Sequence, residues 1–203
     1  MDCPPSTIDL ARAPFRFAGP AKDAIHRLKF SGWRSVAAAL ADAVVTIELP
    51  AVDAVTWVPL ARRRLGERGY DQARALALAV GRRLDRPVVR LCRRGPVAGS
   101  QARRSGPERR DAMRGVFAPL GREVPPRVLL VDDVLTTGAT AGDCARALRE
   151  GGATTVVLAT AARSLRPRGV AAARSGARFR EAGRAYTRPG SRPGLWLPGD
   201  PPR

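Results

Sequence analysis

The residues best suited to chemistry stand together in the stretch 128–140. Residues 128–131 are an uninterrupted apolar run, and the two carboxylates Asp132 and Asp133 follow it directly. The small polar loop after them consists of Thr136, Thr137, Gly138, Ala139 and Thr140. Adjacent carboxylates can accept hydrogen bonds from sugar hydroxyls and help to hold a hydrated metal ion. A loop that opens a helix directs backbone N–H groups at an anion, most simply a phosphate.

The elements around this stretch predict where it lies in the fold. Pro125-Pro126 precedes the apolar run and turn residues follow it, which is typical of a strand buried on both faces of a parallel sheet. Residues 141–148 favour a helix. Open α/β sheets bind ligands at the carboxyl ends of their strands, where the two acids and the loop are expected.

Two other interpretations explain the stretch less well. Acids after a strand can simply cap the next helix, but capping does not require the whole pattern Asp-Asp-x-x-Thr-Thr-Gly-x-Thr. A P-loop requires Gly-Lys-Ser/Thr, which is absent, and here the acids precede the loop. The pattern instead resembles, at nearly every position, the phosphoribosyl-diphosphate (PRPP) motif of the type I phosphoribosyltransferases. This resemblance implies that Asp132 and Asp133 are the catalytic acids along the ribose 2′ and 3′ hydroxyls, and that 136–140 grips the 5′-phosphate.

Composition allows one α/β domain with an appendage and makes two full domains unfavourable, since the chain has 203 residues. The net charge of +18 suggests a polyanionic partner such as nucleic acid. Only Lys22 and Lys29 are lysines, however, and the abundance of Arg, Ala, Gly and Pro resembles the codon bias of a high-GC genome, so the charge is weaker support than its size suggests. No membrane span, signal-peptide core, disulfide framework or zinc site is indicated, and we expect a cytoplasmic protein.

The order of patterns along the chain predicts three parts. Residues 1–17 are expected to be an irregular N-terminal remnant, 18–163 a phosphoribosyltransferase-like domain, and 164–203 a disordered basic tail. Within the domain we expect helices from residue 20 to about 44 and over 71–84, and strands at 55–58, 88–91, 128–131 and 155–159. The alternation of strand and helix indicates a mostly parallel sheet with right-handed crossovers. Residues 93–116 are expected to form a long, mobile excursion.

Several further segments, in one order, resemble the ComF family of phosphoribosyltransferase-like proteins, which is associated with natural competence and DNA uptake. These are Leu28-Lys29-Phe30, Val58-Pro59-Leu60, Arg68-Gly69-Tyr70-Asp71-Gln72, Gln101, Glu108-Arg109 and Gly115-Val116-Phe117. The lid segment and the PRPP motif together also resemble the transferase part of glutamine amidophosphoribosyltransferase. The resemblance implies a type I phosphoribosyltransferase fold with a flexible lid that carries Gln101 and Arg109. It further implies a pyrophosphate-binding loop made of Ala61, Arg62, Arg63 and Arg64.

The chain departs from the family pattern in three places. Family members usually begin with a four-cysteine zinc module, of which only Cys3 is a candidate, so we expect either that the module is lost or that the sequence starts inside the gene. Asp71 stands where an asparagine is usual, and Ala112 stands where another is expected. These changes put the substrate contacts of the lid in question and leave the PRPP motif intact.

Three functions follow as hypotheses. The first is a Mg²⁺-dependent transferase that binds PRPP and passes its phosphoribosyl group to an unknown nitrogen acceptor, a base or an amine, with release of pyrophosphate. The protein alone supplies no metal site, so Mg²⁺ is expected to arrive with PRPP near the acids. The second is a non-catalytic competence accessory that binds DNA or a DNA-processing protein, and the third is a regulator with PRPP as effector. No nucleobase pocket can be identified, and a homodimer is left open.

Overall fold

The computed structural model describes residues 7–30, 34–95, 115–121, 123–164 and 178–179. The lid residues predicted from the sequence, Gln101 and Arg109, lie outside these ranges. So does most of the predicted tail 164–203.

A mostly parallel sheet forms the centre of the molecule, with the strand order β3-β6-β7-β1-β8 and with β2 added to β7. Every strand pair of this sheet is parallel. The strands are β1 (Leu10–Arg12), β2 (Phe15–Arg16), β3 (Ala54–Trp57), β6 (Arg127–Leu135), β7 (Thr155–Arg163) and β8 (Arg178–Phe179). The four apolar residues 128–131 of β6 are fully buried. The predicted α/β class and the buried central strand are therefore confirmed.

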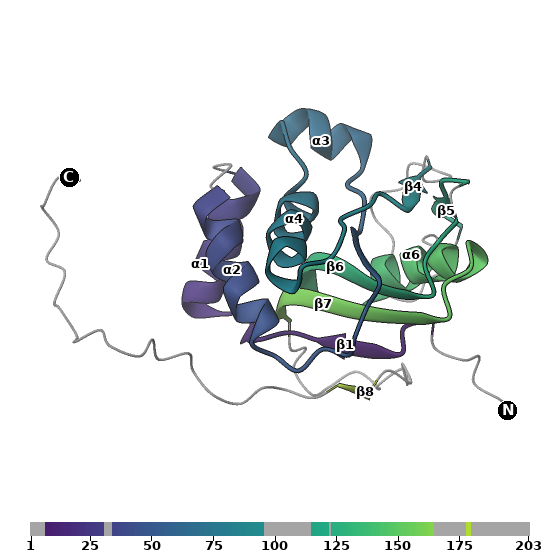
Figure 1. Cartoon of the computed structure of the whole chain (residues 1–203). Coiled ribbons are helices and arrows are strands. Elements are labelled where there is room, and N and C mark those ends of the chain that lie inside the picture. Colours follow the sequence, from purple (N-terminus) through teal and green to yellow (C-terminus); the bar gives the residue numbers. More distant parts are fainter. Residues whose placement is uncertain (1–6, 31–33, 96–114, 122, 165–177, 180–203) are drawn as a thin grey trace, which may run out of the picture.

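Helices cover both faces of the sheet (Figure 1). The helices α1 (Gly19–Phe30), α2 (Arg34–Val45) and α4 (Gln72–Leu84) pack on one face, and α6 (Ala139–Glu150) packs on the other. Side chains of β6 alternate between the two cores. Leu129 and Val131 join the cluster of α1, α2 and α4, whereas Val128 and Leu130 join the cluster of α6. Within the described ranges every helix is too short or too polar to span a lipid bilayer.

The N-terminal segment differs from the irregular remnant expected over 1–17. Both β1 and β2 pair in parallel with β7, and the side chains of Ile8, Ala11 and Ala13 are buried. Asp9 accepts a hydrogen bond from the backbone N–H of Val156 at 2.7 Å. Strands of two or three residues are too short to show a hydrophobic period in the sequence. They are recognised only by their pairing with β7 in the structure.

Two other segments also depart from expectation. In the predicted 88–91 strand only Val88 forms an isolated bridge, and the strand proper is β4 (Cys92–Arg94). It pairs antiparallel with β5 (Phe117–Pro119) in a separate ribbon across the undescribed residues 96–114. Within the predicted tail, the two residues of β8 pair with β1. Both pairings join residues that are far apart in the sequence, and local sequence patterns do not predict such pairings.

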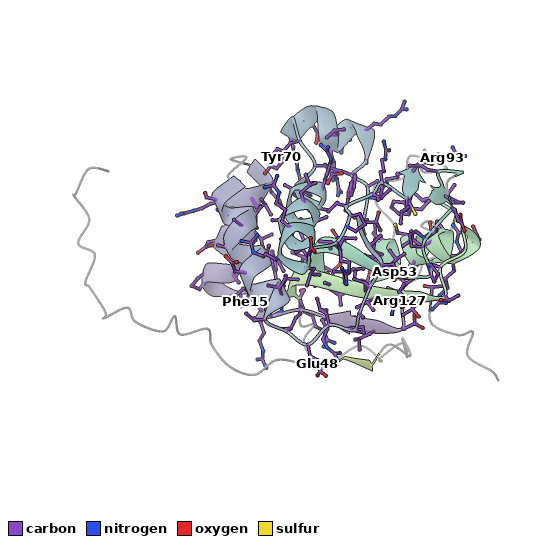
Figure 2. The ribbon with its side chains drawn as sticks, viewed as in Figure 1. Phe15, Glu48, Asp53, Tyr70, Arg93 and Arg127 are labelled. Atoms are coloured by element: carbon purple, nitrogen blue, oxygen red, sulfur yellow. The ribbon has the colours of Figure 1, made fainter. Side chains whose placement is uncertain are left out.

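An ion pair joins the amino ends of the neighbouring strands β3 and β6. The guanidinium of Arg127, at the start of β6, contacts the carboxylate of Asp53, just before β3, at 2.5 Å (Figure 2). The backbone N–H of Arg127 also donates to Asp53 at 2.9 Å. This charged pair lies at the end of β6 opposite to the two acids of the motif.

Candidate active site

The two acids lie inside β6, near its carboxyl end, rather than after the strand as predicted. Because neighbouring residues of a strand point to opposite faces, Asp132 follows the alternation toward α6 and Asp133 toward α1 and α4. The strand therefore places two carboxylates of the same type in two different layers of the molecule.

Asp133 is held by two side chains from different helices. The ammonium of Lys29, in the last turn of α1, contacts its Oδ2 at 3.0 Å. The side-chain amide of Gln72, the first residue of α4, donates to the same oxygen at 3.4 Å. Gln72 is only 5% exposed, and its Oε1 atom has no hydrogen-bond partner among the described residues. On this side of the site, the charge of the Asp133 carboxylate is thus compensated, while the buried Oε1 atom of Gln72 can still accept a hydrogen bond.

Asp132 has a different environment. Its Oδ1 accepts a hydrogen bond from the backbone N–H of Asp133 at 2.8 Å. Burial raises the pKa of Asp132 well above its usual range, and the neighbouring charge of Asp133 raises it further. The ionised form of Asp132 is therefore poorly stabilised until further hydrogen-bond donors or a cation arrive.

The predicted phosphate loop leads directly into α6. Gly138 occupies the N-cap position with φ 76°, a left-handed conformation that favours glycine. The N-cap residue Gly138 has no side chain to cap the helix, and the hydroxyl of Thr137 accepts from the backbone N–H of Ala139 at 3.3 Å. Thr136 and Thr137 are exposed, while Gly138, Ala139 and Thr140 are half-buried. The loop thus has the helix-opening geometry that suits an anion.

The predicted pyrophosphate loop is largely helical. Ala61 is the N-cap residue of α3 (Arg62–Arg68), so Arg62, Arg63 and Arg64 form its first turn. Arg63 pairs with Glu67 one turn later at 2.9 Å, and this spacing favours the helix. All three arginines are exposed. Glycine punctuation suggested a loop, but Gly69 instead ends the helix in a left-handed conformation.

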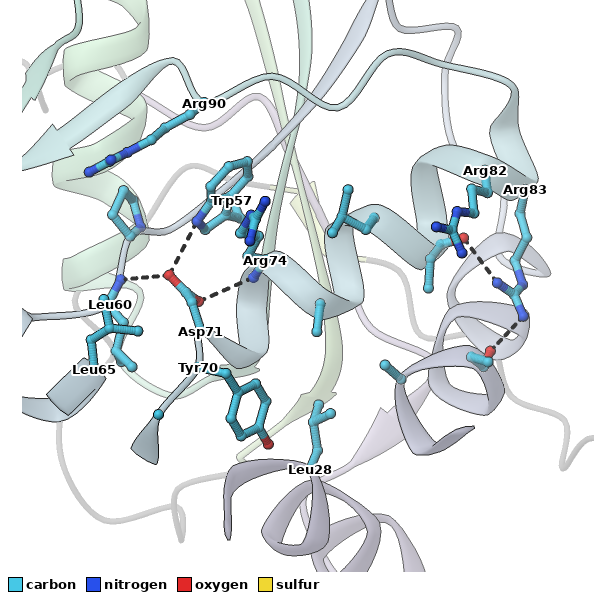
Figure 3. Close-up of a pocket in the computed structure, with 17 residues that line it drawn as sticks. Leu28, Trp57, Leu60, Leu65, Tyr70, Asp71, Arg74, Arg82, Arg83 and Arg90 are labelled. Atoms are coloured by element: carbon cyan, nitrogen blue, oxygen red, sulfur yellow. Dashed lines mark hydrogen bonds between the residues drawn. The ribbon is translucent and has the colours of Figure 1, made fainter. Parts of the chain in front are cut away.

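Asp71 forms hydrogen bonds to residues both before and after α3. Its Oδ2 accepts hydrogen bonds from the indole N–H of Trp57 at 3.2 Å and from the backbone N–H of Leu60 at 3.1 Å (Figure 3). Its Oδ1 accepts from the backbone N–H of Arg74 at 3.1 Å and so caps α4. Asp71 therefore orients both the segment that enters α3 and the helix that begins with Gln72.

A groove of about 1050 Å³ lies beside Asp71. Apolar side chains such as Leu60, Leu78 and Ala79 line it together with Arg82 and Arg90. Figure 3 shows the groove. Neither acid of the motif lines it. The groove thus borders the outer side of the α3 connection rather than the carboxyl end of β6.

The β4–β5 ribbon is anchored to α6 by Asp143. Its two carboxylate oxygens accept from the backbone N–H groups of Gly115 and Phe117, each at 2.9 Å. Arg146 also donates to Asp143 at 2.9 Å and to the carbonyl of Phe117 at 2.9 Å. Burial raises the pKa of Asp143, but these hydrogen bonds outweigh it, and the net pKa is lowered.

The described residues contain no cluster of three His, Cys, Asp or Glu side chains that could hold a metal ion. The available donors are the two carboxylates of β6. Mg²⁺ commonly uses one or two carboxylates together with substrate phosphates and water, so this donor set fits an ion that is held mainly by its substrate.

Sequence reasoning did not assign site roles to Lys29, Gln72 or Arg94. The first two lie in segments that resemble the family, Leu28-Lys29-Phe30 and Arg68–Gln72. That resemblance could have indicated them as site residues. Arg94 is one arginine among many in its segment, and no local pattern distinguishes it.

Comparison with known proteins supplies the relatives of this chain. It is 36% identical over 116 residues to competence protein F of Haemophilus influenzae, a match that covers 55% of this chain and 51% of the relative. It is 31% identical over 155 residues to the DNA utilization protein YhgH of Escherichia coli O6:H1, covering 69% of this chain and 66% of that protein. It is also 33% identical over 147 residues to competence protein ComFC of Streptococcus pneumoniae, covering 70% of this chain and 63% of that protein. The chain belongs to the ComF family. No family model matches it, and it spans about half to two thirds of these relatives.

Among solved structures, the chain is similar to the B. subtilis glutamine PRPP amidotransferase complexed with ADP and GMP. The TM-score is 0.46 at 22% identity, over 63% of this chain and 26% of the other. Apart from that similarity, the mostly parallel sheet places the two acids and the loop 136–140 near the carboxyl end of β6, the end of the strand at which the sequence predicted them.

Proposed function

We propose that this ComF-family protein binds PRPP with Mg²⁺ at the carboxyl end of β6 and transfers the phosphoribosyl group to a nitrogen acceptor. The observation that carries the proposal is that the acid pair, the left-handed Gly138 and the start of helix α6 follow one another along one stretch of chain. A carboxylate pair suits the ribose hydroxyls, and a helix start suits the 5′-phosphate.

The residues of the chain would divide the work of the reaction. Asp132 and Asp133 accept hydrogen bonds from the ribose, and the loop 136–140 holds the 5′-phosphate with its N–H groups. The C1–O bond to pyrophosphate breaks with its electron pair on the pyrophosphate oxygen, the nitrogen lone pair forms the C1–N bond, and the nitrogen loses its proton to water. Bound Mg²⁺ would neutralise charge on the pyrophosphate.

The test is calorimetric titration of PRPP with Mg²⁺ into the full chain, together with an assay for pyrophosphate release against a panel of bases and amines. We expect binding in the unaltered protein and none in the double variant Asp132→Asn/Asp133→Asn. Asp53→Asn is the matched control, because it removes the same charge at the opposite end of β6. Equal binding by the double variant and the control would exclude the site.

A second candidate function is favoured by the names of the relatives. One is a competence protein and another a DNA utilization protein, and this chain carries a net charge of +18. A role as a DNA-binding accessory predicts that affinity for DNA falls steeply with added salt and on deletion of residues 164–203. DNA binding without PRPP binding would favour this function over the transferase. The predicted cytoplasmic location and the possible homodimer remain predictions.

A further inference from the structure

Two large apolar side chains remain exposed on the described surface, and both line the groove beside Asp71. Leu65 of α3 is 41% exposed, and Leu78 of α4 is 36% exposed. The helix α3 has no buried residue, whereas a helix of a globular protein normally buries one apolar face. Exposed apolar side chains that two helices direct to one groove indicate an interaction site.

One face of α4 runs along the groove over most of the length of the helix. Between Arg74 and Arg82 the helix rises by about 12 Å, a little more than two turns. Small side chains between these two positions leave room for a second helix to lie close to α4. The residues of this face recur at helical spacing and line the groove: Arg74, Ala75, Leu78, Ala79, Arg82 and Arg83.

The groove offers no strand edge to an extended peptide within the described ranges. The strand β3 already exchanges hydrogen bonds with the segment after α4. The N–H of Val55 donates to the carbonyl of Pro87 at 2.9 Å, and its carbonyl accepts from Val89 at 2.9 Å. Pro59, which lines the groove, has no N–H to donate. A helix satisfies its own backbone hydrogen bonds, so it fits this groove better than a strand.

The charge of the groove is positive. Arg74, Arg82 and Arg90 are exposed, and no described carboxylate lies at ion-pair distance from any of them (Figure 3). Arg83 is already in an ion pair with α2. Asp71 also lines the groove, but its carboxylate accepts three hydrogen bonds from within the fold. The three guanidinium groups without an ion-pair partner therefore favour a ligand that carries carboxylates.

Other parts of this chain have the wrong charge for the groove. Residues 164–203 contain nine arginines and two carboxylates, and residues 96–114 contain five arginines and two carboxylates. A second copy of the chain carries the same net charge of +18. Each of these would bring like charges to the three arginines, which is unfavourable. The complementary occupant is therefore a different molecule, and an acidic one.

The exposed apolar part of the groove is aliphatic, which favours a protein over a nucleic acid. Single-stranded nucleic acid binds by stacking its bases on aromatic rings. The Trp57 ring is only 8% exposed, and the guanidinium of Arg74 lies 5.9 Å from its centre. Tyr70, the other ring of the lining, is half-buried. The exposed leucines instead suit the aliphatic side chains of a partner protein.

We infer that this groove binds an acidic amphipathic helix of a partner protein. The apolar face of that helix packs on Leu65 and Leu78, and its carboxylates, about two turns apart, pair with Arg74 and Arg82. The inference goes beyond the proposed function and does not depend on it, because the two acids of β6 do not line the groove.

The test is a fluorescence anisotropy titration of a labelled helical peptide with the full chain. The peptide has about five helical turns, leucines at helical spacing along one face and glutamates on the flanks of that face. A peptide with the same composition in shuffled order keeps the charge and loses the apolar face. We expect the amphipathic peptide to bind at least about tenfold more tightly than the shuffled one.

Leu78→Asp and Arg82→Glu test the apolar and the charged contacts separately. Leu78→Asp should weaken binding of the amphipathic peptide by about tenfold or more, and Arg82→Glu by about fivefold or more. Both side chains are exposed, so each variant should melt within about 2 °C of the unaltered protein. The affinity for PRPP should stay within about twofold in both variants, because neither residue belongs to the proposed PRPP site.

Arg93→Glu is the matched control for Arg82→Glu. Arg93 is exposed on β4 and lies away from Tyr70, which lines the groove (Figure 2). The control reverses the same charge outside the groove, so the affinity for the amphipathic peptide should stay within about twofold of the unaltered protein.

The inference is overturned by any of three results: no binding of the amphipathic peptide, equal affinity for the shuffled peptide, or equal weakening by Arg93→Glu and Arg82→Glu. It is also overturned if a single-stranded oligonucleotide displaces the peptide and itself binds Leu78→Asp more weakly, which would assign the groove to nucleic acid. If the unaltered protein binds the peptide as expected but does not bind PRPP, the proposed function fails and the inference stands.

Discussion

Asp132 and Asp133 are neighbours in the chain, but their side chains face different layers of the molecule and have different partners. Asp133 faces the layer of α1 and α4, where Lys29 and Gln72 already contact it. Asp132 faces the layer of α6, where burial raises its pKa and the backbone N–H of Asp133 donates a hydrogen bond to it. One face of the strand presents an acid that the protein has already stabilised, and the other presents an acid that awaits a ligand. The chemistry of a carboxylate is thus decided by the layer it faces.

Asp133→Asn should have the largest effect. It leaves the ammonium of Lys29, whose side chain is 20% exposed, without its carboxylate. We expect a loss of about 2 kcal/mol in the free energy of unfolding, below the range for fully buried pairs because this pair retains some solvent. Binding of PRPP should be lost.

Urea unfolding and calorimetry measure these two effects of Asp133→Asn. The control is Asp53→Asn, which breaks a more exposed ion pair and should destabilise the protein less. A greater loss in the control than in Asp133→Asn would show that Asp133 is not the compensated acid of the pair.

Asp132→Asn should change stability in the opposite direction. A raised pKa means that the ionised form of Asp132 disfavours the folded state, so removal of the charge should stabilise the free protein at neutral pH. We expect the melting temperature to rise by about 2–4 °C, which corresponds to about 1 kcal/mol in a chain of this size. Binding of PRPP should weaken at the same time.

The pH dependence of the Asp132→Asn effect sharpens this prediction. The stabilisation should fade below a pH of about 4, where the wild-type carboxyl is protonated in both the folded and the unfolded chain. Melting temperatures of the two proteins measured from acid to neutral pH provide the check. A lower melting temperature for the variant at neutral pH would reverse the assignment.

Asp71→Asn tests the support of the Asp133 face. Asparagine has one acceptor oxygen, so it cannot both cap α4 and accept from Leu60 and Trp57 as Asp71 does. We expect a loss of about 1 kcal/mol in unfolding free energy and a several-fold weaker affinity for PRPP, through displacement of α3 and Gln72. Urea unfolding and calorimetry would show this. Unchanged values for both would mean that Asp71 and the usual asparagine of the family are equivalent here.

Asp143→Asn tests the support of the Asp132 face and should have the smallest effect. Because the pKa of Asp143 is lowered in the folded state, its contribution to stability is present above the unfolded pKa and is lost as the pH falls through the folded value. The variant should be about 0.5–1 kcal/mol less stable at neutral pH, and the difference should vanish in strong acid.

Hydrogen exchange can localise the effect of Asp143→Asn. The backbone amides of Gly115 and Phe117 donate to Asp143, so they should exchange faster in the variant than in the unaltered protein. Equal exchange at both amides would show that the β4–β5 ribbon is not anchored through this carboxylate.

Local patterns predicted the parts of the site whose information is local. The apolar run of β6, the helix after Gly138 and the helix capped by Asp71 each carry their signal within a few residues. The α3 segment was misjudged because glycine can end a helix as well as open a loop. Long-range pairings such as β1 with β7 and β4 with β5 carried no local signal, since strands of three residues are too short to show a period.

The sequence by itself determined that adjacent acids and a phosphate-type loop lie at the carboxyl end of a buried parallel strand, because residue order alone places them there. The tertiary structure decided what each acid meets. Lys29 and Gln72 come from separate helices to reach Asp133, whereas Arg94, whose pKa is raised by Asp132, comes from the β4–β5 ribbon. Gln72 and Asp133 are 61 residues apart in the chain, so their contact depends on how the helices pack on the sheet. Whether a charged side chain is compensated depends on its distance from other charges in the folded protein, and residue spacing along the chain does not give that distance.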